Sequence, residues 1–127
     1  MKIYLAGGFR SGWQSKVIKR IQHHDFINPA EKEVNEEWTL DKIGVWDLHY
    51  IRNTDVVFAY MENTNPSGIG LSVEVGYAHG LGKTVILILE PGNKTIPDRY
   101  LSFIKKASDI VFDNFEDGIK FLLTFAV

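Results

Sequence analysis

The chain has 127 residues, 45% of them hydrophobic and 24% charged, with a net charge of -2 and no cysteine. This composition is typical of one globular domain spanning residues 1–127, and it argues against a disordered or fibrous chain and against disulfide or thiolate chemistry. The near-neutral charge gives no basic surface for a nucleic acid polymer or an anionic membrane, and the lack of a membrane-spanning run and of a signal-peptide pattern predicts a cytoplasmic protein.

Apolar runs alternate with amphipathic stretches along the chain, which is the pattern of a parallel sheet flanked by helices. The runs predict strands at 3–6, 26–27, 55–60, 84–89 and 110–112. Helical periodicity predicts helices at 13–21 and 40–52, a helix containing Glu74 after a loop at 61–67, and helices at 98–106 and 116–125, while the polar stretch 30–38 predicts a loop. Because parallel crossovers are right-handed, we expect an α/β fold: a three-layer sandwich with a five-stranded parallel sheet in the flavodoxin-like order 2-1-3-4-5.

The helix that follows residue 67 carries a carboxylate on its apolar side. Leu71, Val75 and Ala78 form an i, i+4, i+7 stripe that should face the sheet, and Glu74 falls on the same stripe. Burying an unpaired carboxylate costs several kcal/mol, so an acid at this position is either paired or used for chemistry or ligand binding.

A second inward acid occurs in the helix before the central strand. Asp47 shares a stripe with Leu40, Ile43 and Ile51 at the spacing i, i+3, i+7, i+11. Either acid alone could cap backbone amides or pair with an arginine. Two such acids on helices beside the central strand favour a catalytic pair, working as acid and base or as nucleophile and acid at an acetal-like carbon.

The turn after the first strand reads Gly7-Gly-Phe-Arg-Ser-Gly12 and opens a helix. Glycines let the main chain approach a ligand, a helix N-terminus favours an anion, and Arg10 can fork onto a phosphate or carboxylate. The turn lacks the third glycine of a dinucleotide fingerprint and the Gly-Lys-Ser/Thr of a P-loop, so it does not predict NAD or ATP binding. The structural alternative is a tight turn with Arg10 in solvent.

Other candidates fit structural roles better. His23-His24 lies beside Asp25 without a further ligand at usable spacing, so we interpret it as solvated and predict no metal site. Trp13 either stacks a base or belongs to the core. A phospho-receiver domain shares the strand pattern, but it needs an aspartate at the end of the central strand, where this chain has none.

Four segments carry a family resemblance, and the likeness extends over nearly the whole chain. They are Ile3-Tyr-Leu-Ala-Gly-Gly8, Trp46-Asp-Leu48, Thr54-Asp-Val-Val57, and Pro66-Ser67 together with Glu74-Val-Gly-Tyr-Ala78. In these segments the chain resembles the nucleoside 2-deoxyribosyltransferases and the related 2′-deoxynucleoside 5′-phosphate N-hydrolases.

The resemblance implies a role for each inward acid. Glu74 matches the nucleophile that attacks the anomeric carbon of a 2-deoxyribosyl group, expels the base and forms a covalent glycosyl-enzyme. Asp47 matches the general acid, and Tyr4 matches the tyrosine that orients the nucleophile. The residues that match or adjoin contacts to the sugar or phosphate are Gly7, Gly8, Arg10, Ser11, Ser67, Gly68, Gly70 and Ser108, the last contributed across a dimer.

The resemblance also implies the partners, which are a deoxynucleoside or deoxynucleotide and a free nucleobase, with no metal or organic cofactor and at least a homodimer. We therefore expect transfer of the deoxyribosyl group to another base. The segment 96–101 lacks the Asn-x-Met pattern usual in the transferases, and 7–12 is similar to the phosphate loop of the N-hydrolases. A 5′-monophosphate N-hydrolase with water as acceptor stays open as an alternative, and so does a non-catalytic nucleotide-binding module.

Overall fold

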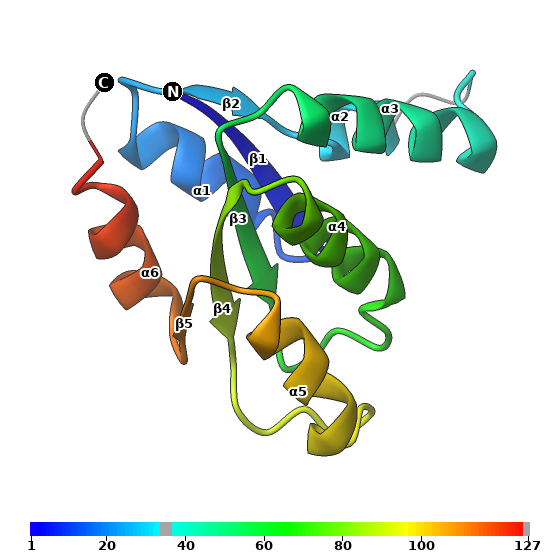
Figure 1. Cartoon of the computed structure of the whole chain (residues 1–127), viewed down its shortest axis with the longest axis vertical. Coiled ribbons are helices and arrows are strands. Elements are labelled where there is room, and N and C mark those ends of the chain that lie inside the picture. Colours follow the sequence, from blue (N-terminus) through cyan, green and yellow to red (C-terminus); the bar gives the residue numbers. More distant parts are fainter. Residues whose placement is uncertain (34–36, 126–127) are drawn as a thin grey trace.

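The computed structural model describes residues 1–33 and 37–125. Its centre is a five-stranded parallel sheet in the order β2-β1-β3-β4-β5 (Figure 1). The strands are β1 (Lys2–Gly7), β2 (Asp25–Ile27), β3 (Val56–Met61), β4 (Thr84–Leu89) and β5 (Ile110–Phe112). This confirms the predicted α/β class and strand order.

The central strand β3 explains why the sequence pattern was clear. All of its residues are buried, because a parallel strand with helices on both faces has no solvent side and is therefore apolar throughout. In the register of the sheet, Tyr4 of β1 lies opposite Val57 of β3, and Val57 lies opposite Val85 of β4.

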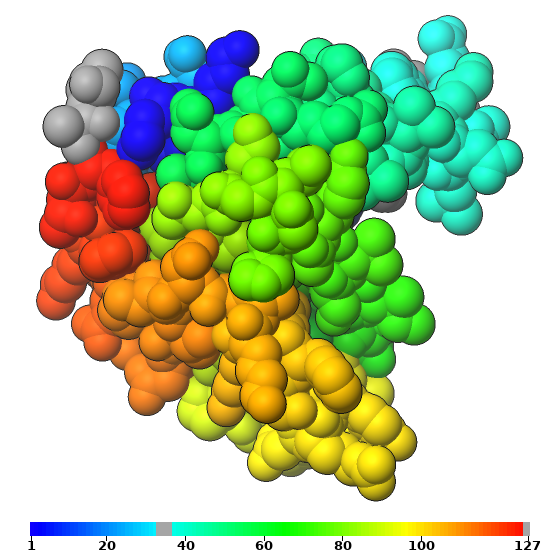
Figure 2. All heavy atoms as spheres, viewed as in Figure 1, coloured from blue at the N-terminus to red at the C-terminus, as the bar shows by residue number. Residues whose placement is uncertain are grey.

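Helices cover both faces of the sheet. One face packs against α1 (Trp13–Arg20) and α6 (Phe115–Leu122), and the other against α3 (Leu40–Arg52), α4 (Ile69–Gly80) and α5 (Asp98–Lys106). Along β1, Ile3 and Leu5 belong to the core under α1 and α6, whereas Tyr4 and Ala6 face α3, α4 and α5. In the space-filling view α4 and α5 cover the front of the sheet (Figure 2). The acids of α3 and α4 are thus on the same side of the sheet as Tyr4.

The loop predicted at 30–38 is wrong in its first part. Residues Ala30–Glu33 form the short helix α2, while 34–36 lie outside the described residues. The helix begins here because the Asn28 side chain accepts a hydrogen bond from the amide of Ala30 (3.1 Å), and Pro29 has a backbone angle suited to a helix start.

The elements α3, β4, α5 and β5 have the predicted bounds, and the ends of the other predicted elements differ by one to three residues. Helix α6 begins at Phe115, one residue earlier than predicted, because the Asn114 side chain caps it by accepting a bond from the Asp117 amide (2.9 Å). It ends at Leu122 instead of 125. Within residues 1–33 and 37–125, no helix has the length and apolar character needed to cross a membrane.

Candidate active site

Three polar side chains meet between the sheet and two of its helices. They are Tyr4 of β1, Asp47 of α3 and Glu74 of α4. Tyr4 is fully buried, and its hydroxyl is close enough to both carboxyl groups for each of them to raise its pKa. The sequence predicted the two inward acids from periodicity and Tyr4 from the resemblance, and the fold brings all three together.

Helix α4 turns Glu74 inward as its apolar stripe requires. Leu71, Val75 and Ala78 are all buried against the sheet. Gly68, with a φ of 104°, precedes the helix, and a Cβ at this position would collide with the side chain of Met61. A larger residue at 68 would be strained by this φ, and the end of the Met61 side chain would have to move.

Helix α3 follows its predicted stripe only in part. Ile43 and Ile51 are buried, but Leu40 is 81% exposed. The reason is geometric, since the amino-terminal end of α3 extends past the strands (Figure 1). Asp47 lies between the two buried isoleucines, where the helix is still packed on α4.

The environment of Glu74 opposes its negative charge. Burial raises its pKa to about 7; the Tyr4 hydroxyl partly offsets this by favouring the ionised carboxylate, and the charge of Asp47 adds to the rise. Burial also raises the pKa of Tyr4, and the charge of Glu74 raises it further. At neutral pH the phenol therefore stays protonated, and Glu74 is divided between its acid and carboxylate forms.

The Tyr4 hydroxyl and Glu74 Oε2 are buried, yet neither has a hydrogen-bond partner of normal geometry among the described residues. The hydroxyl is close enough to the Glu74 carboxyl to favour its ionised form, although the geometry of the two groups is not that of a normal hydrogen bond. Buried polar atoms are nearly always bonded in proteins, so atoms left over in a cleft are available to a ligand.

The acid pair opens into a pocket of about 500 Å³ between α3 and α4. This volume is in the range of small-molecule sites. Its lining combines Asp47, Glu74 and a third acid, Asp41, with glycines and apolar side chains. The lining residues are Leu40, Asp41, Gly44, Val45, Asp47, Leu48, Gly70, Val73 and Glu74. The predicted Gly70 is thus at this site.

A second pocket, of about 270 Å³, lies between the turn after β1 and the loop after β3. It is lined by Gly8, Phe9 and Arg10 from the turn and by residues 62 and 64–66 from the loop. Arg10 is exposed and makes no ion pair or hydrogen bond within the described part of the chain. The Ser11 hydroxyl donates to Glu62 Oε1 (2.7 Å) and ties the turn to the loop.

The predicted glycines 7 and 8 differ in how closely other atoms approach them. Gly7 has a φ of 148°, and a Cβ there would collide with the backbone oxygen of Tyr60. A Cβ on Gly8 would lie 3.4 Å from the side-chain nitrogen of Asn65, which is an ordinary contact. Of the two, Gly7 is therefore the one that lets the turn lie close to the carboxyl end of β3.

The two predicted serines fall in different places. Ser67 lies just before α4, and its hydroxyl accepts a bond from the amide of Ile69 (3.2 Å). Ser108 donates to the carbonyl of Ile104 (2.7 Å) at the end of α5. The next residue, Asp109, is hydrogen-bonded to Val85 near the amino end of β4. Ser108 therefore lies beside that end of β4, and within one copy of the chain it is not part of the acid pair's surroundings.

Two sequence interpretations outside the site are settled by packing. Trp13 is 2% exposed and packs edge-on against Tyr60, so of its two interpretations the core one is confirmed. His24 is not solvated as expected, because it is 8% exposed and contacts the terminal amine of Met1 (3.2 Å) and the carbonyl of Phe125 (3.2 Å).

In the loop after β3, sequence reasoning singled out Ser67 and Gly68 but missed Glu62 and Asn65. Asn65 lies against Gly8, and its side chain accepts a bond from the amide of Ser67 (3.2 Å). The Asn65-Pro66 pair is a turn signal, and it was the only local clue. Glu62 likewise lacked any periodic pattern to mark it.

Comparisons with known proteins identify one family and two solved structures that this chain resembles. The model of a family described as "nucleoside 2-deoxyribosyltransferase like" matches residues 1–91. A conserved protein from Enterococcus faecalis V583 shares the fold with a TM-score of 0.68 and 17% identity, over 94% of this chain and 95% of that one. The CMP N-glycosidase BcmB of Clostridium botulinum does so with a TM-score of 0.65 and 16% identity, over 98% of this chain and 100% of its own. Curated protein sequences gave no significant match.

Proposed function

Because this chain belongs to the nucleoside 2-deoxyribosyltransferase-like family, we propose that it breaks the N-glycosidic bond of 2′-deoxyribonucleosides through a covalent deoxyribosyl-Glu74 intermediate and passes the sugar to another base. The observation that carries the proposal is the group formed by Tyr4, Asp47 and Glu74, in which two acids and a phenol share one buried space. A binding module would gain nothing from keeping both acids inward at a cost in stability.

In the proposed first step a carboxylate oxygen of Glu74 forms a bond to C1′ of the sugar. The bond from C1′ to the base nitrogen breaks, its electron pair stays on the base, and Asp47 supplies the proton that the base takes up. In the second step a nitrogen of another base attacks C1′ and gives its proton to Asp47 as the bond to Glu74 breaks. The transition state of each step is oxocarbenium-like, and a carboxylate away from water stabilises it strongly.

Tyr4 is proposed to orient the nucleophile. Burial and the charge of Glu74 raise the pKa of Tyr4, so its hydroxyl can only donate to the carboxylate. Donation favours the ionised form of Glu74, which is the form that attacks. The apolar side chains around the acids, such as Val45 and Val73, suit the flat face of a base.

The second candidate is a nucleoside 5′-monophosphate N-hydrolase, in which water takes the sugar from Glu74. The exposed Arg10 in the pocket between the turn and the loop favours it, since a guanidinium binds phosphate by two parallel hydrogen bonds. The CMP N-glycosidase that shares the fold is by its name a nucleotide-cleaving enzyme, and this also supports a phosphorylated substrate.

The deciding experiment incubates the protein with deoxynucleosides, their 5′-monophosphates and CMP, with and without a second free base, followed by chromatography. A new nucleoside indicates the transferase, and free base with released sugar or sugar phosphate indicates the hydrolase. No change in any mixture refutes both and favours the binding module.

Two variants test the mechanism. We expect Glu74→Ala to abolish base release and Asp47→Ala to slow it, because one removes the nucleophile and the other only the proton donor. Glu31→Gln, an exposed acid of α2, is the control and should leave turnover unchanged. Normal turnover by the Glu74 variant would exclude the covalent mechanism.

A further variant tests the substrate. Arg10→Ala should weaken the use of 5′-monophosphates selectively, while Lys19→Ala, which removes an exposed cation of α1, should not. If Arg10→Ala lowered activity on free deoxynucleosides by the same factor, Arg10 would not be recognising the phosphate.

A homo-oligomer is part of the same proposal. Beside the acid pocket, Leu40, Val45 and Val73 are 81%, 72% and 56% exposed, which is unusual for large apolar side chains grouped in one place. A second copy would cover them and could bring its Ser108 to the site. Light scattering coupled to size exclusion tests this, and a monomer at working concentration would contradict it.

A further inference from the structure

Two loops at the carboxyl end of the sheet are hydrogen-bonded to each other. The β3–α4 loop (residues 62–68) leads from the central strand to the helix of Glu74, and the β4–α5 loop (residues 90–97) follows the neighbouring strand. The backbone continues the β3–β4 pairing to this point, with the Glu90 amide bonded to the carbonyl of Met61 (3.1 Å). The β4–α5 loop therefore starts directly beside the β3–α4 loop.

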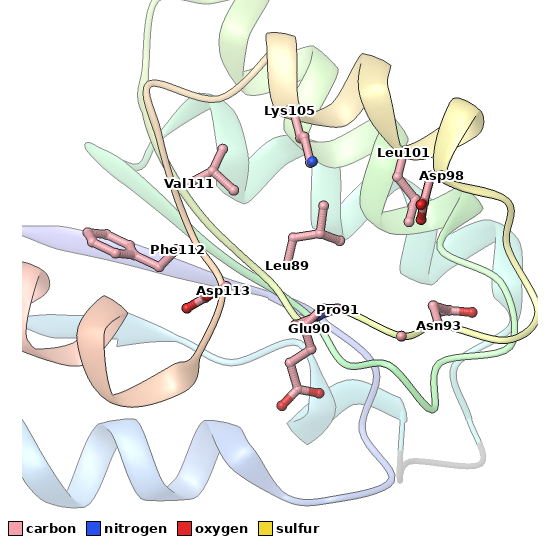
Figure 3. Close-up of a pocket in the computed structure, with 11 residues that line it drawn as sticks. Leu89, Glu90, Pro91, Asn93, Asp98, Leu101, Lys105, Val111, Phe112 and Asp113 are labelled. Carbon is pink, nitrogen blue, oxygen red and sulfur yellow. The ribbon is translucent and has the colours of Figure 1, made fainter.

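Glu90 is the main link between the loops. Its Oε2 accepts the hydroxyl of Tyr60 (2.7 Å), and its Oε1 accepts the amide of Asn63 in the β3–α4 loop (2.9 Å). Both carboxylate oxygens are thus used. Figure 3 shows the carboxylate directed away from Lys105 and Leu101, which line the neighbouring cavity. Glu90 is also part of the lining of that cavity, but its carboxylate is bonded to Tyr60 and to the β3–α4 loop.

Asn93 is the second link. Its side-chain nitrogen donates to the carbonyl of Asn65 (3.1 Å). Its oxygen accepts the amides of Thr95 (2.9 Å) and Ile96 (3.0 Å). Because two backbone donors face the oxygen, the orientation of the amide is determined, and the nitrogen must point to Asn65.

The β3–α4 loop held in this way forms one wall of the Arg10 pocket and the approach to α4. Asn65 lies against Gly8 and bonds the amide of Ser67, whose hydroxyl bonds the first amide of α4. Neither Glu90 nor Asn93 lines the Arg10 pocket or the acid pocket. They act on these sites only through the backbone of the loop.

We propose that Glu90 and Asn93 are positioning residues which fix the β3–α4 loop and thereby set the affinity for the sugar and 5′ end of the substrate, with little influence on the chemical step. The inference rests on the proposed function, because it assigns the Arg10 pocket to the substrate. The hydrophobic residues that pack α3 and α4 on the sheet include neither Glu90 nor Asn93, so we expect the reacting groups to stay in place when the loop loosens.

The kinetic test uses Glu90→Gln, Asn93→Ala and Tyr60→Phe, with Asp98→Asn as control. In Glu90→Gln one carboxylate oxygen becomes an amide nitrogen, which cannot accept a hydrogen bond, and the negative charge is lost, so the bonds to the Tyr60 hydroxyl and the Asn63 amide are weakened. We expect KM for the cleaved substrate to rise about tenfold with kcat changed less than about twofold. Asp98 lines the same cavity as Glu90, but its side chain makes no hydrogen bond to a described residue, so its variant should match the wild type.

Tyr60→Phe keeps the test usable if Glu90→Gln does not fold. It removes only the hydroxyl and leaves the packing of the ring on Trp13 and Phe115 intact. It should raise KM less than Glu90→Gln does, and the double variant should be no worse than Glu90→Gln alone, because both remove the same bond. The inference would be overturned if kcat of Glu90→Gln and Asn93→Ala fell as much as their KM rose. It would also be overturned if their KM equalled that of the Asp98→Asn control.

Hydrogen exchange of the amides of Asn63 and Ser67 separates this inference from the proposed function. Faster exchange in Glu90→Gln and Asn93→Ala, together with the rise in KM, supports positioning. Unchanged exchange, or faster exchange without a change in KM, refutes it. If the wild type cleaves no substrate, the proposed function fails, and the dissociation constant of a deoxynucleoside 5′-monophosphate replaces KM. A constant that the variants leave unchanged then refutes the positioning role.

Discussion

Replacing Glu74 by glutamine should stabilise the protein while it abolishes turnover. Burial raises the pKa of this carboxyl from 4.5 to about 7. At about 1.4 kcal/mol per pKa unit, keeping it ionised in the folded state costs about 3 kcal/mol once the pH exceeds the folded pKa. Glutamine has nearly the same shape and no charge, so the variant avoids this cost.

The pH dependence follows from the direction of the shift. Below pH 4.5 the carboxyl is protonated in both states and costs nothing. As the pH rises towards 7 the folded protein holds a proton that the unfolded chain has released, so the wild type loses stability over this range. The variant should be more stable than the wild type by less than about 1 kcal/mol at pH 5 and by about 3 kcal/mol at pH 8.

Urea denaturation of both proteins at the two pH values measures the difference directly. Glu31→Gln, an exposed acid, should show no comparable change in stability between the two pH values. A Glu74→Gln protein that is less stable than the wild type at pH 8, or a difference that does not grow with pH, would refute the buried-charge reasoning.

Three further predictions concern pH, backbone strain and the surface. The rate constant kcat/KM should rise with pH through about 7, because the attacking form of Glu74 is the carboxylate; a flat acid limb would contradict this. Gly7→Ala should lower the free energy of unfolding by more than about 2 kcal/mol, since φ is 148° and a Cβ meets backbone. Gly12→Ala, with φ 69° and nothing within 4 Å, should cost less, and equal melting temperatures would contradict the clash. Removing the Arg20–Glu116 pair, whose side chains are 41% and 58% exposed, should leave thermal unfolding unchanged; a clear fall would show that the pair matters.

The parts of the fold that sequence predicted are those governed by regular burial. Strand β3 is apolar at every position and α4 has a regular stripe, so their positions and types were clear. The short α2 has no stripe to reveal it and depends on a cap by Asn28. The exposed Leu40 shows the limit of periodicity, because a helix pattern cannot tell where the helix leaves the sheet.

The candidate site divides in the same way. Glu74 and Asp47 stood out because each interrupts an apolar stripe, a signal that needs only local sequence. Glu90 and Asn93 gave no signal, since their importance comes from bonds to a loop 28 or 27 residues away along the chain. The burial of His24 has the same origin, because its bond to Phe125 joins residues 101 apart.

Water access is the physical quantity that separates transfer from hydrolysis in the proposed mechanism. Both reactions pass through the same glycosyl-Glu74, and they differ only in which nucleophile reaches C1′ first. In one copy of the chain the acid pocket is bordered by exposed Leu40, Val45 and Val73, so water at its bulk concentration competes with any base. A second surface placed over α3 and α4 would exclude water from the pocket, while a flat base could still lie between that surface and these side chains. We therefore expect the choice of acceptor to depend on what covers α3 and α4, and not on the acid pair itself.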